Sequence, residues 1–277
     1  MISARIGYQG MVAKVNEFNR LMTSTPDFFI EAALGRVKGI SSISKFGRNP
    51  DIGTATDPED VWGAGGLWVA PTQERIHNVA SSSANDDVGN TGAQRIRIEG
   101  LDRSFSPQTE DVDMNGTSDV ATAKAYTRIY RAYVLESGSN GTNVGDITMT
   151  AQTDLTVTAQ IDADLGQTEM AIYTVPSGFM GLILSVYAVM GDSGGGSAAY
   201  TDLRLIQVSN VDTGSPTSRV QHTFSLITAG NSHYEHLFRI PLIVHGPADL
   251  ILRATEVSNN STVVSGGFDM LLVNGHL

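Results

Sequence analysis

Residues 237–254 read LFRIPLIVHGPADLILRA, in which two apolar runs are separated by the turn-forming His245-Gly246-Pro247. The same alternation of short apolar runs with Gly, Pro, Ser and Asp breaks continues through residues 166–277. Short strands separated by turn signals at this spacing are typical of an antiparallel sandwich or barrel. The predicted strands are Met170–Val175, Leu182–Val189, Leu203–Val208, Val220–Leu226, Leu237–Val244, Leu250–Ala254 and Phe268–Val273.

The β pattern begins at about residue 74. Gln94–Ile98 and Tyr126–Leu135 alternate like strands, Ile147–Thr158 is rich in Thr, and Asn115-Gly116 is a strong tight-turn dipeptide. We therefore predict an all-β fold, an antiparallel β-sandwich with a jelly-roll-like body over residues 73–277. Two sub-sandwiches with a boundary near residue 165 are the alternative.

Residues 1–72 differ from this body. Apolar residues at helical spacing predict a short helix near 10–23, and Asp27–Val37 is a second helix candidate with Asp27 as its N-cap. Residues 46–72 are rich in Gly, Pro and Asp, which predicts irregular structure. We predict a mostly irregular or partly helical N-terminal arm and linker, with an apolar arm that does not fold by itself as the alternative.

Composition excludes several classes of function. Eighteen basic and 29 acidic residues give a net charge of −11, which disfavours direct binding to nucleic acid or to anionic membranes. The absence of cysteine excludes disulfides and thiolate metal sites. No stretch approaches the length of a membrane span, and the N-terminus lacks the apolar core of a signal peptide, so we expect no Sec export.

One motif resembles a catalytic signature. Gly191-Asp192-Ser193-Gly194-Gly195 matches the string around the nucleophile of chymotrypsin-like proteases, and His77 precedes it in the right order. That chemistry needs a histidine base and a buried carboxylate to activate the hydroxyl. The surroundings of His77 do not fit the family pattern, and Gly196 replaces the usual proline. We predict a flexible hairpin loop here.

Histidine and carboxylate clusters are candidates for metal or catalytic sites. His233 and His236 would point to opposite faces of a strand, which disfavours a metal pair, and His222 and His245 are far away in the sequence. Three acidic groups are candidates: the first two are predicted to be solvated turn residues rather than calcium ligands, and the third could be nominated as a glycosidase pair, a pattern that carries no weight alone. They are Asn85-Asp86-Asp87, Asp57 with Glu59 and Asp60, and Glu110 with Asp111 or Asp113. We predict no enzyme activity, no cofactor and no metal.

Both tryptophans, Trp62 and Trp68, lie in the predicted linker. Tryptophans in irregular segments often anchor the chain to its own core or to a partner. Pinning of the linker to the body and contact with another subunit are the two interpretations. We predict Phe28, Phe29, Trp62 and Trp68 as subunit-contact residues.

Two sets of segments resemble uncharacterised structural proteins of tailed bacteriophages, especially marine ones. The first set is Lys45–Asp51, Asp60–Gly66, Gly100-Leu101-Asp102 and Met114–Thr117. The second is Tyr173–Gly178, Arg253-Ala254-Thr255, Asn259-Asn260-Ser261 and Ser265–Val273. The resemblance implies a virion component and brings no catalytic motif with it.

The leading hypothesis is a capsid decoration (cement) protein, with a homotrimer favoured, that bridges shell subunits through residues 1–72. Its partners would be other virion proteins, either the major capsid protein or tail subunits, and it would join the virion in the host cytoplasm. A tail protein, as a fibre-like receptor binder or an adaptor, is the alternative. Exposed aromatics such as Tyr200 or Tyr234 would then meet host glycans. A hydrolase that uses Ser193 or an acidic pair is the third class.

Overall fold

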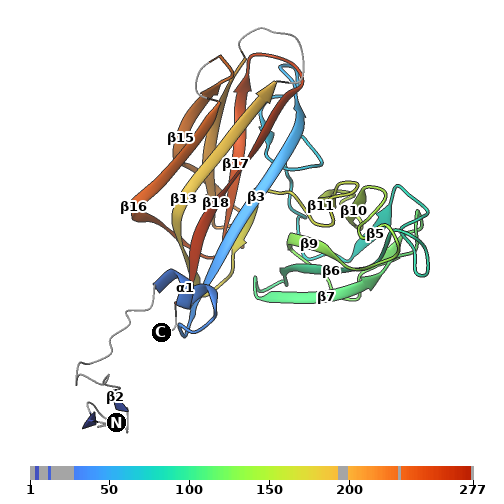
Figure 1. The fold of residues 1–277 in the computed structure, drawn as a ribbon, viewed down its shortest axis with the longest axis horizontal. Helices are drawn as coiled ribbons and strands as arrows, with labels where there is room; N and C mark the ends of the chain where they lie inside the picture. Colours follow the sequence, from blue (N-terminus) through green and yellow to red (C-terminus); the bar gives the residue numbers. More distant parts are fainter. Residues whose placement is uncertain (1–3, 6–11, 14–27, 193–198, 230–231, 276–277) are drawn as a thin grey trace, which may run out of the picture. The chain divides into compact units, whose positions relative to one another are not determined.

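The computed structural model describes residues 4–5, 12–13, 28–192, 199–229 and 232–275. It is nearly all β, with 58% strand and 3% helix, and its sheets are antiparallel, which confirms the predicted fold class. The chain forms two compact units, residues 1–41 and 42–277 (Figure 1). None of its described helices is long and apolar enough to cross a membrane.

The described parts of the first unit are small. Strands β1 (Ala4–Arg5) and β2 (Val12–Ala13) pair with each other, and helix α1 spans Phe28–Ala33. The helix predicted over 27–37 therefore forms over six residues. The helix predicted near 10–23 falls outside the described residues, except for the two that form β2.

The second unit contains a jelly roll. Among the described strands, a four-stranded sheet has the order β16-β13-β18-β3, and a five-stranded sheet has the order β12-β17-β14-β15 with one short strand off this path. Numbered one to eight along the chain, these orders are 6-3-8-1 and 2-7-4-5, the double Greek key of a jelly roll. The strands are β3 (Ile40–Ile52), β12 (Ile172–Val175), β13 (Phe179–Asp192), β14 (Tyr200–Ser209), β15 (Thr217–Ile227), β16 (His233–His245), β17 (Ala248–Val257) and β18 (Thr262–Asn274). Six of the seven runs predicted in this region lie within one of these strands, and the seventh, Met170–Val175, overlaps β12 over Ile172–Val175.

Alternating apolar residues build the core between these two sheets. Val186 of β13 packs with Leu203 of β14 and Leu252 of β17, and Phe268 of β18 lies in a neighbouring buried cluster with Leu205 of β14. Because successive strand residues point to opposite faces, this pattern fixes the register of each strand. A short strand, β4 (Glu59–Asp60), extends the second sheet by pairing with β17.

The connection between β3 and β12 carries an insertion that forms two further sheets. One sheet has the order β11-β10-β5-β8 and the other β7-β6-β9. The inserted strands are β5 (His77–Ser81), β6 (Ala93–Leu101), β7 (Pro107–Asp113), β8 (Val120–Ala121), β9 (Arg128–Ser137), β10 (Ile147–Ala151) and β11 (Val157–Ile161). Most of their buried apolar residues, such as Ile96, Ile129 and Ile147, belong to one cluster, which also includes Ile172 of β12 and Ile251 of β17. We call residues 62–169 the inserted region.

The predicted linker contains regular structure. Strand β3 continues to Ile52 through Pro50, and β4 follows at Glu59. Proline is tolerated in β3 because this strand is the last in its sheet and needs no donor on its free side. Residues 42–72 therefore belong to the same compact unit as the sandwich.

Candidate functional site

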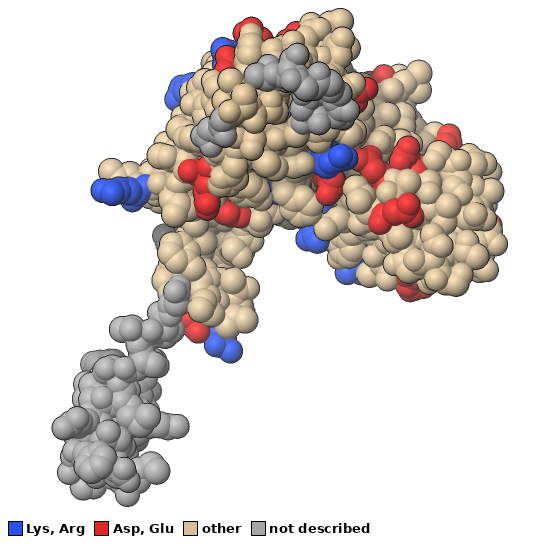
Figure 2. Space-filling view, turned by 45° about the horizontal axis from the view of Figure 1, so that its top comes forward, with Lys and Arg blue, Asp and Glu red and all other residues tan. Residues whose placement is uncertain are grey.

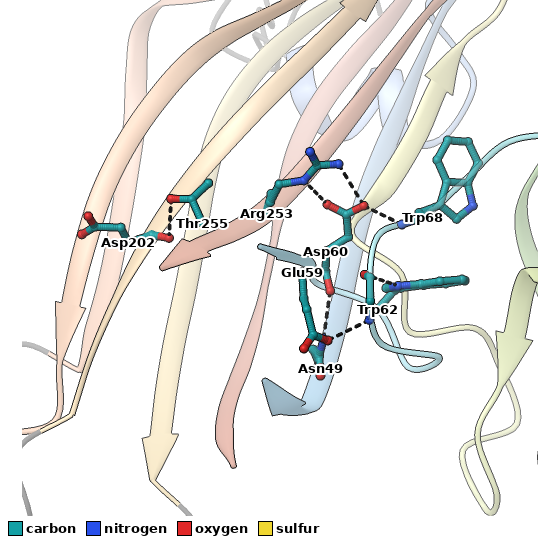
Figure 3. A network of polar contacts seen from close by, with 9 residues as sticks. Asn49, Glu59, Asp60, Trp62, Trp68, Asp202, Arg253 and Thr255 are labelled. Atoms are coloured by element: carbon teal, nitrogen blue, oxygen red, sulfur yellow. Dashed lines mark hydrogen bonds and ion pairs between the residues drawn. The ribbon is translucent and has the colours of Figure 1, made fainter. Parts of the chain in front are cut away.

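A buried ion pair holds the linker against strand β17. The Arg253 guanidinium donates from Nε to Asp60 Oδ1 at 2.6 Å and from Nη2 to Oδ2 at 3.2 Å (Figure 3). The backbone N–H of Trp68 also donates to Asp60 Oδ2, at 2.7 Å. The carboxylate of Asp60 is fully buried, and burial raises its pKa while the bonds from Arg253 and Trp68 oppose that rise.

Glu59, the neighbour of Asp60, organises the turn that follows β4. Its Oε2 accepts from Asn49 Nδ2 at 2.9 Å and from the backbone N–H of Gly66 at 2.7 Å, and Oε1 accepts from the Thr56 hydroxyl. Burial works against the charged form, but these hydrogen bonds outweigh it and hold the pKa of Glu59 below its usual value. Glu59 thus joins β3 to the loop that carries both tryptophans.

A second buried pair joins the inserted region to the same strand. Arg128 of β9 forms two hydrogen bonds with Asp249 of β17, Nε to Oδ1 at 3.0 Å and Nη2 to Oδ2 at 3.1 Å. The Thr174 hydroxyl donates to Asp249 Oδ1 at 2.6 Å. The guanidinium also lies 5.4 Å from the ring centroid of Phe105 and 5.7 Å from that of Trp68. We call the Arg253–Asp60 and Arg128–Asp249 pairs the β17 clamp.

The acidic turns are less solvated than the sequence predicts. Asp86 is fully buried: its carboxylate accepts from the Ser81 hydroxyl at 2.5 Å and from the backbone N–H groups of Ala93 (2.8 Å), Val144 (2.8 Å) and Gly145 (2.9 Å). Glu59 and Asp60 are buried as well. The prediction of solvated turns was wrong for these three carboxylates, which are held by protein donors.

His77 is buried without a catalytic partner. Its Nδ1 lies 3.0 Å from the backbone oxygen of Arg75, its Nε2 has no hydrogen-bond partner, and its ring packs edge-on against Tyr126. Burial lowers the pKa of His77 to about 4. Ser193, the nucleophile of the protease-like motif, lies outside the described residues.

The other nominated acids are already engaged. Asp111 pairs with Arg97, and Asp113 pairs with Arg95 on strand β6. Glu110 Oε2 instead accepts from two backbone N–H groups, those of Ala123 and Lys124. These carboxylates cross-link strands and turns of the inserted region.

Histidines and aromatic rings form a ladder between β15 and β16. His222 stacks on His236 at 4.9 Å between ring centroids, Phe224 stacks on Tyr234 at 4.2 Å, and Phe238 meets His236 at 4.7 Å. Tyr234 is half-buried in this ladder, and its hydroxyl lies 2.7 Å from His222 Nε2. His233 is exposed, whereas His236 lies in the ladder. The two side chains therefore point to different sides of β16, as predicted. Among the described residues, no group of three or more His, Cys, Asp or Glu is arranged to hold a metal ion.

The four predicted contact residues fall into two environments. Trp62 and Trp68 are buried in the core of the inserted region, where Trp62 Nε1 donates to the Gly66 oxygen and Trp68 Nε1 donates to the Thr158 oxygen. Phe28 and Phe29 lie in α1 with 47% and 54% of their surfaces exposed. The two tryptophans therefore lie inside the fold, whereas the two phenylalanines are about half exposed.

A further apolar surface was not predicted from the sequence. Strands β15 and β16 form one side of the jelly roll, away from the inserted region (Figure 1), and we call this side the β15–β16 edge. It exposes large apolar side chains. They are Val220, Ile227, Leu237, Ile240 and Ile243. Apolar runs alone could not reveal this surface, because the same residues read as core positions.

The comparisons with known proteins give weak likenesses. No protein-family model and no curated protein matches the chain. A chain from a structure of infectious bursal disease virus, Gt strain, is similar over 90% of this chain and 78% of that chain, with 10% identity and a TM-score of 0.24. A chain from a crystal structure of the VP2 subviral particle of the same virus is similar over 91% of this chain and 75% of that chain, with 11% identity and a TM-score of 0.20. Values at this level establish neither a shared fold nor a shared function.

The burial of His77 predicts that the free energy of unfolding depends on pH. The pKa of His77 is the ordinary 6.5 in the unfolded chain and about 4 in the folded chain. As the pH falls, the unfolded chain therefore takes up this proton at a higher pH than the folded chain does. The contribution of His77 to stability is therefore present above pH 6.5 and is lost as the pH falls toward 4. The full loss is about 3 kcal/mol.

Urea unfolding of the native chain and of His77→Phe at about pH 7 and about pH 4.5 measures this contribution. The phenylalanine keeps the ring contact with Tyr126 but has no proton to bind. We expect the native chain to lose more stability on acidification than the variant does. Equal losses would show that His77 does not carry the effect.

Proposed function

We propose that this chain is a structural protein of a bacteriophage particle and that it serves there as a capsid decoration protein that bridges shell subunits. One observation carries the proposal. The chain has a jelly-roll body, and a helix with exposed apolar side chains comes before this body in the sequence. Jelly rolls of this kind build viral capsid and lectin domains. Because a fold does not by itself define function, the contact surface has to carry the argument.

Helix α1 supplies such a surface. Phe28, Phe29, Ile30 and Leu34 are each about half exposed or more, although single soluble chains seldom display large apolar clusters without a partner. The rings of Phe28 and Phe29 form a T-shaped, edge-to-face contact with their centroids 5.7 Å apart. Burial of these rings against a shell subunit would provide the apolar area that a decoration protein needs to stay attached.

The resemblance of the sequence to structural proteins of tailed phages supports the same class. So does the state of the candidate catalytic groups, since His77 and the nominated carboxylates of the inserted region are buried or engaged in structural bonds. A tail protein, either a receptor binder or an adaptor, would use the same kind of surface. The location of the chain on the particle separates the two.

Attachment through α1 predicts the effect of a double substitution. A Phe28→Ser/Phe29→Ser variant should be at least tenfold depleted from purified particles, because its polar side chains remove the apolar anchor. The measurement is quantitative immunoblotting of particles from the phage that encodes the chain, complemented with either form. Val88→Ser, a change at another exposed apolar residue, is the matched control and should be incorporated normally.

A truncation gives a second test of the same attachment. The deletion has to end at Lys38, because removal of residues 1–45 would cut into β3 and damage the sandwich. The shortened chain should keep the cooperative urea unfolding and the β-type far-UV spectrum of the sandwich, and it should fail to join particles. Normal incorporation of both the truncated chain and the double variant would contradict the proposed contact.

A further inference from the structure

We propose that the β15–β16 edge is a self-association surface, on which strand β16 of one copy packs antiparallel against β16 of a second copy around a two-fold axis at Leu237. This inference does not rest on the proposed function, and it concerns a different surface from α1. The occupant is a second copy of this chain. The following observations support it.

The first observation is the exposure of strand β16 at the end of its sheet. Among the described strands it pairs with β13 alone within the sheet. From His233 to Leu237 this pairing is regular, and Tyr234, His236 and Phe238 face the aromatic ladder. The intervening side chains point away from the ladder, so that Leu237 is 68% exposed.

The second observation is an apolar bulge beside Leu237. The register with β13 shifts between the partners of Leu237 and Leu242, and Ile240 in this bulge is 84% exposed. Native edge strands are usually protected by charges, proline or bulges. Pro241 and the bulge end the regular pairing here, yet they carry an isoleucine outward rather than a charge. The bulge thus prevents further strands from adding to the edge by backbone hydrogen bonds. Its exposed isoleucine still offers an apolar surface to a second copy of the chain.

The third observation is the order of charges around Leu237. Glu235 precedes it by two residues and Arg239 follows it by two, and both are exposed. Neither side chain forms an ion pair or a side-chain hydrogen bond among the described residues, where seven ion pairs are found elsewhere. In a two-fold antiparallel arrangement residue i meets residue j and j meets i. Glu235 of each copy then lies opposite Arg239 of the other, which gives two complementary pairs that flank two leucines.

The fourth observation is the charge of the surface relative to the rest of the chain. Residues 217–245 contain Arg219, Arg239 and Glu235, which gives +2 − 1 = +1, in a chain of net charge −11. Figure 2 shows acidic side chains in several clusters on the face displayed and basic side chains scattered between them. Two acidic molecules repel each other. An edge without excess negative charge therefore avoids this repulsion between two copies.

Sedimentation equilibrium of the full chain tests the contact. The native protein should be a dimer at about 100 µM. Glu235→Arg and Arg239→Glu each place two like charges opposite one another, and the two-fold axis repeats this contact. Each single variant should therefore raise the dissociation constant of the dimer about tenfold or more. The double reversal Glu235→Arg/Arg239→Glu restores opposite charges and should return the constant to within about threefold of the native value.

Leu237→Ser should also weaken the dimer, whereas Leu155→Ser, at another highly exposed leucine, should not. Circular dichroism confirms that each variant is folded. A native monomer, a trimer, or a double reversal as weak as the single reversals would overturn the proposal. The Phe28→Ser/Phe29→Ser variant should still dimerise, so failure of the self-contact and failure of the particle contact are seen separately.

Discussion

Replacement of Asp249 by alanine is expected to lower the free energy of unfolding by about 3–5 kcal/mol. The reason is that Arg128 remains with its charge in place and without its partner, since both side chains of the pair are almost completely buried. The Thr174 hydroxyl loses its acceptor as well. Urea unfolding followed by circular dichroism measures the difference.

A double variant separates the ion pair from the space it fills. Arg128→Met/Asp249→Leu removes both charges and keeps apolar volume, so it should be more stable than Asp249→Ala alone. A single Asp249→Ala variant within about 1 kcal/mol of the native chain would contradict the clamp, because that is the range of an exposed ion pair.

Asp60→Ala is expected to destabilise the chain by about 2–3 kcal/mol, which is less than Asp249→Ala. Asp60 is fully buried, but the Arg253 side chain is 23% exposed and gains water when its partner is lost. The backbone N–H of Trp68 then also lacks an acceptor. The same urea titration measures the effect.

Asp51→Ala is the matched control for Asp60→Ala. Asp51 is an exposed carboxylate on β3, close in sequence, and its substitution should change stability by less than about 0.5 kcal/mol. If Asp60→Ala and Asp51→Ala had the same effect, the Arg253–Asp60 pair could not be what holds the linker to β17.

Seven of the eight jelly-roll strands were predictable, whereas strand β3 and the pairing of the strands were not. Runs such as Leu250–Ala254 are apolar on both faces or alternate clearly, and local sequence carries that signal. The jelly-roll order depends on partners far apart in the sequence, as in the pairing of β13 with β18. Pro50 made the end of β3 read as a loop, although an edge strand accepts proline.

The β17 clamp was not predictable for a related reason. Asp60 and Asp249 are paired with arginines 193 and 121 residues away, so nothing near them in the sequence distinguishes them from solvated turn acids. Asp86 is likewise identified by donors from Ala93 and Val144, on two separate segments. The exposure of Leu237 and Ile240 escaped prediction because an apolar edge strand and an apolar core strand have the same composition.

Immunogold electron microscopy of intact particles of the encoding phage, with antibody against this chain, tests the proposed function most directly. We predict label spread over the shell of the head, with none on particles from a deletion strain. Label confined to the tail would contradict the decoration role and leave a virion protein of another kind. Absence of label from particles, with the chain recovered only in the particle-free fraction, would contradict the structural role altogether.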